Sequence, residues 1–241
     1  MIGSSTKNIW IDLDNLIDVK SFLDLSEEIC MGIAKSATTQ PHICDPGSRV
    51  IKLKPEMIYP FEIEPKWKDK LESLTSYEKR IFLKYYEKAH YSVSGVFLKL
   101  HSGYMNKDRD EGAVWTPNAQ YFPNLIKYIH TLPFTEFGRV FIFTLDHYSV
   151  LTEHRDSMYD GLRDDTPEFL WFTIDKNAMR FYIKDNDDKK HYIESTCAWF
   201  NDSDRHSSAG VIDATFCLRI DGIFTDKFRE KIRWKLSSLQ T

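Results

Sequence analysis

Apolar and polar residues alternate with a period of two through the second half of the chain, and this pattern restricts the folds available to it. Residues 215–221 read TFCLRID, 179–184 read MRFYIK and 169–174 read FLWFTI. Successive side chains of a strand point to opposite faces, so each segment has one aliphatic face and one mixed, more polar face. Such strands suit a sheet that packs against a core on one side and faces a pocket or solvent on the other.

Helical periodicity is found on either side of this region. Apolar residues recur at helical spacing in 18–35, 66–89, 119–130 and 224–239. Short strands are expected near residues 9–13, from Val50 and over 91–100, and residues 185–188 (DNDD) are expected to form a hairpin turn. Residues 102–120, which carry two glycines, a proline and a charged cluster, are expected to form a long loop that could act as a lid.

These patterns predict one α+β domain spanning residues 1–241 with a mostly β core. A helical and mixed N-terminal layer would occupy 1–129, the β core 130–225 and a C-terminal helix 226–241. The formal net charge of −4 gives no overall field that would attract nucleic acid. The four cysteines include no C-x-x-C pair, and no apolar run reaches the roughly 20 residues that span a bilayer. We therefore expect a soluble cytoplasmic protein with reduced thiols and no membrane or nucleic-acid partner.

Three residues in the β region form a candidate metal site. His154 and Asp156 make an H-x-D triplet, and His206 follows downstream. On an extended strand the intervening Arg155 faces away, so that the imidazole and the carboxylate can converge on one ion. Two imidazoles and one carboxylate form the facial triad of non-haem iron oxygenases. The alternative is a turn in which Asp156 caps a backbone amide and His154 is only exposed.

With Arg219 further along the chain, the region resembles the double-stranded β-helix of Fe(II)/2-oxoglutarate-dependent dioxygenases. In that family H-x-D ends the second core strand, the distal histidine opens the seventh, and an arginine lies on the eighth. The stretches LPFTEFGRV and AWFNDSDRH most resemble the aspartyl/asparaginyl β-hydroxylase branch. Two positions depart from that branch: residues 169–174 carry no Arg or His, and Arg219-Ile220-Asp221 stands where many relatives have Arg-x-Ser.

The resemblance implies a jelly-roll or cupin-like core and a set of residue roles. His154, Asp156 and His206 would bind Fe(II), and Arg219 would bind the far carboxylate of 2-oxoglutarate as a guanidinium fork. With O2 the enzyme would hydroxylate an unactivated C–H bond of a peptide side chain, an amino acid or a related small metabolite. Halogenating relatives lack the carboxylate, so Asp156 favours hydroxylation. No catalytic residue is expected beyond the metal ligands, and Trp171, Arg180 and Arg163 are further pocket candidates.

Other functions are weighed against this one. In a protein kinase an asparagine would follow the HRD aspartate five residues on, but Gly161 stands there. Zinc hydrolysis needs no counterpart of Arg219, and the H-E-x-x-H motif is absent. A non-catalytic cupin-like module that binds a small molecule is the remaining alternative, although it would not require both the ligand set and Arg219. Arg219 could also be a solvated arginine on an edge strand.

Overall fold

The computed structural model describes residues 10–37, 94–101, 107–145, 153–154, 168–175, 180–209 and 215–238. The strands are β1 (Trp10–Asp12), β2 (Ser94–His101), β3 (Ala113–Trp115), β4 (Phe134–Leu145), β5 (Phe169–Thr173), β6 (Arg180–Lys184), β7 (Lys190–Tyr192), β8 (Cys197–Phe200), β9 (His206–Ala209) and β10 (Thr215–Phe224). The helices are α1 (Val19–Leu23), α2 (Ser26–Ala37), the 3-10 helix η3 (Pro117–Tyr121), α5 (Pro123–Ile129) and α6 (Asp226–Ser238).

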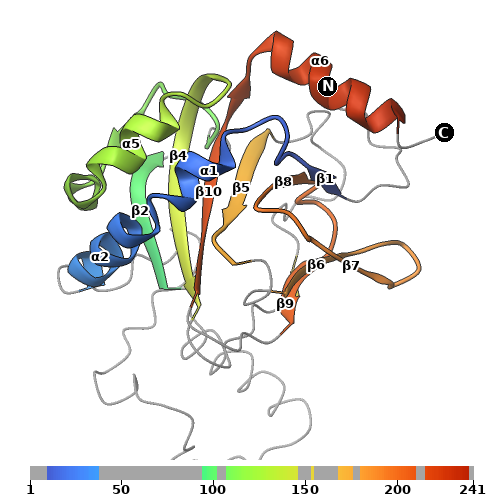
Figure 1. Cartoon of the computed structure of the whole chain (residues 1–241), viewed down its shortest axis with the longest axis horizontal. Coiled ribbons are helices and arrows are strands. Elements are labelled where there is room, and N and C mark those ends of the chain that lie inside the picture. Colours follow the sequence, from blue (N-terminus) through green and yellow to red (C-terminus); the bar gives the residue numbers. More distant parts are fainter. Residues whose placement is uncertain are drawn as a thin grey trace, which may run out of the picture. The chain divides into compact units, whose positions relative to one another are not determined.

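The larger sheet has the strand order β1-β8-β5-β10-β4-β2-β3 (Figure 1). β10 lies at its centre, antiparallel to both β4 and β5, so that Arg219 lies opposite Phe141 on one side and Trp171 on the other. Neighbouring strands are far apart in sequence, which makes most of the pairing long-range. This central position keeps β10 away from both edges of the sheet.

The smaller sheet has the order β7-β6-β9, and His154 extends it through an isolated antiparallel bridge to His206. From β4 onward the chain alternates between the sheets: β4, β5, β8 and β10 belong to the larger sheet, and residue 154, β6, β7 and β9 to the smaller. This winding is that of a double-stranded β-helix. The predicted fold class, an α+β fold with a jelly-roll core, is confirmed.

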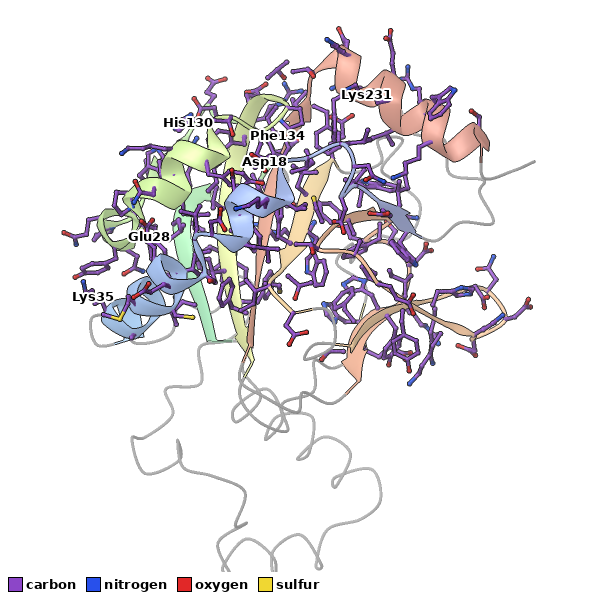
Figure 2. All side chains as sticks on the ribbon, viewed as in Figure 1. Asp18, Glu28, Lys35, His130, Phe134 and Lys231 are labelled. Atoms are coloured by element: carbon purple, nitrogen blue, oxygen red, sulfur yellow. The ribbon has the colours of Figure 1, made fainter. Side chains whose placement is uncertain are left out.

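Helices cover one face of the larger sheet. Phe22 of α1 and Tyr128 of α5 both pack on Phe172 of β5, with ring centroids 4.7 and 6.1 Å away. Glu28 of α2 accepts hydrogen bonds from the backbone N–H groups of Asn124 and Leu125, which caps the first turn of α5 (Figure 2). The C-terminal helix α6 is anchored by Phe228, whose ring lies 5.0 Å from that of Phe224.

Several predicted boundaries are corrected. The helix expected over 18–35 is two helices, because α1 ends at the C-cap Asp24. The helix expected over 119–130 is also two, because Pro123 occupies the first turn of α5, where the missing N–H costs nothing. Within the loop expected over 102–120, β3 pairs with β2 and η3 begins. The strand from Val50 and the helix over 66–89 lie outside the described residues.

The predicted alternation of faces is confirmed, and of the two alternatives for the mixed face, exposure to solvent is excluded for β5 and β10. All five residues of β5 are buried, as are residues 216–222 of β10. The aliphatic face lies under the helices and the mixed face lies inside the barrel, where polar side chains must find partners within the protein. Among the described residues, no helix has both the length and the apolar character needed to cross a membrane.

Candidate metal centre and ion cluster

His154 and His206 lie directly opposite each other in the smaller sheet. His154 N–H donates to the carbonyl oxygen of His206 over 3.1 Å, and His206 N–H donates to that of His154 over 2.9 Å. Paired residues of an antiparallel ladder project their side chains on the same face. The two imidazole centroids are accordingly 4.5 Å apart. Two sequence-distant histidines thus lie side by side.

Both rings lie on the barrel side of the smaller sheet. The His206 ring packs against Phe181 at 5.7 Å and Phe200 at 5.4 Å, and its residue is only 3% exposed. Glu153, the residue before His154, points the other way, where its carboxylate lies 2.9 Å from the Lys184 ammonium group. This is the alternation expected of an H-x-D strand.

One hydrogen bond fixes the tautomer of His206. Its Nδ1 lies 2.8 Å from the carbonyl oxygen of Asp204, and because a carbonyl oxygen can only accept, Nδ1 carries the proton. In the neutral ring, Nε2 then has the lone pair that could ligate a metal. Metal-binding histidines generally donate their second ring N–H to a carbonyl or carboxylate in this way.

The donor chemistry fits Fe(II). Two adjacent imidazoles, one held as the Nδ1–H tautomer, would match two of the three protein ligands in a facial triad. The third predicted ligand, Asp156, lies outside the described residues. Within the described part of the chain, no three His, Cys, Asp or Glu side chains gather around one point.

Arg219 lies inside the barrel rather than on an exposed edge. It is 3% exposed, and its guanidinium carbon lies 4.0 Å from the centre of the Phe169 ring. Its Nε donates to Asp221 over 2.9 Å and its Nη2 to Asp202 over 2.6 Å. The alternative of a solvated edge-strand arginine is therefore wrong.

A second cation reaches the same carboxylates from a distant segment. The Lys107 Nζ lies 3.3 Å from Asp202 Oδ2 and 3.8 Å from Asp221 Oδ1. A Cβ on Gly138 of β4 would lie 2.5 Å from the Lys107 carbonyl oxygen, so a glycine is needed for this close approach. Burial and the neighbouring Arg219 lower the pKa of Lys107 from its ordinary value, against the opposing effect of the two carboxylates.

Of the two carboxylates, Asp221 is held more firmly than Asp202. Its Oδ2 accepts from Arg139 Nε over 2.6 Å, and Arg139 lies directly across the ladder in β4. Burial raises the pKa of Asp221. The positive charges of Arg139, Arg219 and Lys107 outweigh that effect and hold the pKa well below its usual range. We refer to Lys107, Arg139, Asp202, Arg219 and Asp221 as the ion cluster.

Two phenylalanine rings connect the ion cluster to the histidine pair. Phe169, which carries Arg219 on its face, lies 4.9 Å from Phe200, and Phe200 contacts His206. The turn that leads from Phe200 to His206 contains both Asp202, which binds Arg219, and Asp204, whose carbonyl holds His206. The cluster and the histidine pair therefore share one barrel interior and one turn.

The other predicted pocket residues have different outcomes. Trp171 is buried inside the barrel, 5.0 Å from the Phe181 ring. Arg163 and the side chain of Arg180 lie outside the described part of the molecule. Sequence analysis missed Lys107, Asp202 and Asp221. For Asp221 a signal existed, since it lies two residues after Arg219 on the same face of a strand.

A separate cavity of about 260 Å³ lies near the start of α1 and α6, where it is lined by residues that include Asp18, Tyr128, Phe228 and Lys231. Figure 2 labels Asp18 and Lys231. The Asp18 carboxylate already caps α1 through the backbone N–H of Ser21. The cavity shares no residue with the histidine pair or the ion cluster, and we do not assign it to the candidate site.

No family model matches the sequence, and no curated protein matches it. Among solved structures, it is similar to an oxidoreductase of the 2OG-Fe(II) oxygenase family from Burkholderia pseudomallei, with a TM-score of 0.36 and 11% identity over 53% of this chain and 66% of that one. It is also similar to a prolyl-4-hydroxylase from Pseudomonas putida, with a TM-score of 0.29 and 12% identity over 46% of this chain and 69% of that one. For an rmlc-like cupin protein from Desulfovibrio desulfuricans the TM-score is 0.25, with 14% identity over 34% of this chain and 70% of that one.

Proposed function

We propose that this protein is an Fe(II)- and 2-oxoglutarate-dependent dioxygenase that hydroxylates an unactivated C–H bond. The observation that carries the proposal is the bridge between His154 and His206, with the His206 Nδ1 proton committed to the Asp204 carbonyl. A buried arginine on β10, in the same barrel, supports it.

The roles follow from the donor chemistry. His154, Asp156 and His206 would hold Fe(II), and Arg219 would pair with the far carboxylate of 2-oxoglutarate. When bound, the iron supplies the means to activate O2. In the proposed reaction one oxygen atom would enter the substrate as a hydroxyl group and the other would enter succinate as 2-oxoglutarate loses CO2.

The chain's own residues prepare this site in two ways. The Asp204 carbonyl sets the tautomer and orientation of His206 before metal arrives. Phe181 and Phe200 pack on the His206 ring and keep water from it, which strengthens electrostatic interactions inside the barrel.

The substrate proposed is a peptide side chain, an amino acid or a related small metabolite, as in the aspartyl/asparaginyl β-hydroxylase branch that the sequence resembles. Those three classes share a polar backbone or head group that would orient the reacting C–H bond. We place the reaction in the cytoplasm.

The test is anaerobic titration of metal-free protein with Fe(II) and then 2-oxoglutarate, following the visible charge-transfer band of the chelate. We expect the band in the wild type, loss of iron binding in His206→Ala, and retained iron binding in His191→Ala. His191 is the matched control because it pairs with Asp185 in the β6–β7 hairpin. Iron affinity that is unchanged in His206→Ala would overturn the proposal, and absence of iron binding in the wild type would favour a cupin-like binding module.

A further inference from the structure

We propose that Asp202 is an internal competitor for 2-oxoglutarate: its carboxylate pairs with Arg219 and turns to Lys107 when the far carboxylate of the cosubstrate binds. This inference rests on the proposed function. It assigns to Asp202 and Lys107 a role in setting the affinity for dicarboxylate 2-oxo acids.

The geometry singles out Asp202 as the exchangeable carboxylate. Its Oδ2 accepts from Arg219 Nη2 over 2.6 Å and lies 3.3 Å from Lys107 Nζ, so one oxygen already lies between two cations. A change of its side-chain rotamer could strengthen the contact with Lys107 as the contact with Arg219 is lost. The carboxylate would remain paired throughout, which a group that is 2% exposed requires.

Asp221 is unsuited to that exchange. It lies on β10 beside Arg219 and is held by Arg139 from the neighbouring strand at 2.6 Å. Moving the Asp221 carboxylate would break its bond to the Arg139 guanidinium as well as its bond to Arg219. Asp221 Oδ1 therefore contacts both Nε and Nη2 of Arg219, each at 2.9 Å, and Asp202 Oδ2 makes the shorter contact with Nη2, at 2.6 Å.

The competition has a chemical consequence. A ligand carboxylate that pairs with Nη2 of Arg219 would compete with the charge-assisted hydrogen bond to Asp202, so the attraction of the arginine for the ligand would be reduced. A 2-oxo acid without a second carboxylate, such as pyruvate, has no group that would pair with Arg219. Asp202 thus affects 2-oxoglutarate and leaves pyruvate unaffected, which separates its role from general support of the metal site.

The experiment measures the Kd of Fe(II)-loaded, oxygen-free protein for 2-oxoglutarate and for pyruvate by calorimetry. In Asp202→Asn, whose amide makes a weaker neutral hydrogen bond, we expect the Kd for 2-oxoglutarate to fall by about tenfold while that for pyruvate stays the same. Asp187→Asn makes the same charge change on the exposed β6–β7 hairpin and should leave both values unchanged.

A second variant acts in the opposite direction. Lys107→Gln removes the cation that would receive the displaced carboxylate, so we expect weaker binding of 2-oxoglutarate and no change for pyruvate. Circular dichroism at the temperature of the titrations verifies that each variant is folded.

The outcomes separate the two proposals. If the wild type binds 2-oxoglutarate and the Kd of Asp202→Asn is unchanged or higher, the role of Asp202 is overturned. The proposed function is left standing. If Asp202→Asn does not fold, an unchanged Kd in Lys107→Gln overturns it equally. Wild-type protein that binds iron but no 2-oxo acid, or no iron at all, overturns both.

Discussion

The two faces of β10 are equally buried and chemically opposite. Toward the helices lie Phe216, Leu218 and Ile220, which are 2%, 0% and 0% exposed; inside the barrel lie Cys217, Arg219 and Asp221, which are 4%, 3% and 1% exposed. The helix-facing side chains gain free energy by leaving water. The charges of Arg219 and Asp221 lose hydration, and their pairing regains that cost only when the geometry is good.

This difference indicates why each face has its composition. An aliphatic face contributes stability and tolerates substitutions that keep its volume. A buried ion pair is weak evidence for stability, because apolar residues of similar size often serve as well or better. We therefore interpret the ion cluster through the binding role proposed for Arg219 rather than through stability.

The largest effect is expected from Asp221→Ala. It leaves Arg139 and Arg219 facing each other in a buried site without the carboxylate between them. We expect a loss of about 3–5 kcal/mol in the free energy of unfolding, measured by urea denaturation. Asp226→Ala is the control, since that carboxylate pairs with Arg229 at the surface, and it should leave the midpoint unchanged. A stable Asp221→Ala protein would mean that the cluster is not closed to solvent.

Acid should weaken the cluster through Asp221. The pKa of Asp221 is lowered in the folded protein, so the unfolded chain takes up a proton first as the pH falls. The stabilisation is present above the unfolded pKa of about 3.9 and is lost as the pH falls through the folded value. We expect the unfolding free energy of the wild type to fall more steeply between about pH 5 and pH 3 than that of Asp221→Asn. Parallel slopes would contradict this.

The aliphatic face should respond more mildly. Ile220→Val removes one methylene group from a fully buried side chain on the helix side of β10. We expect a loss of about 0.5–1.5 kcal/mol in urea denaturation, with no change in the Kd for Fe(II). A change in iron affinity beyond twofold would show that the two faces are not independent.

The sequence predicts much of this contrast. Alternation in TFCLRID placed Arg219 and Leu218 on opposite faces, and the turn at 185–188 is confirmed by the hydrogen bond from Asp188 N–H to the Asp185 carbonyl. Local signals suffice there because a strand has a period of two and a hairpin turn has its own composition. The start of a new helix at Pro123 is also a local signal, but the sequence analysis predicted a single helix over 119–130.

Other parts of the site depend on contacts that local patterns do not encode. Lys107 reaches Asp202 only because its segment packs on Gly138, and no periodicity connects those positions. The pairing of His154 with His206 likewise depends on the winding of two sheets. The ligand roles of His154, His206 and Asp156 were predicted from a family resemblance, and all three remain predictions.

The smallest effect concerns a thiol on the charged face. Burial raises the pKa of Cys217, against a hydrogen bond with Trp171 and the charge of Arg219. Because the thiolate is the reactive form, we expect iodoacetamide to label the exposed Cys30 in native protein and to spare Cys217 until urea unfolds the chain, as read by peptide mass mapping. Rapid labelling of native Cys217 would mean that water reaches this face of β10. The ion pairs beside it would then be solvated, and the loss expected for Asp221→Ala would shrink to the value of a surface pair.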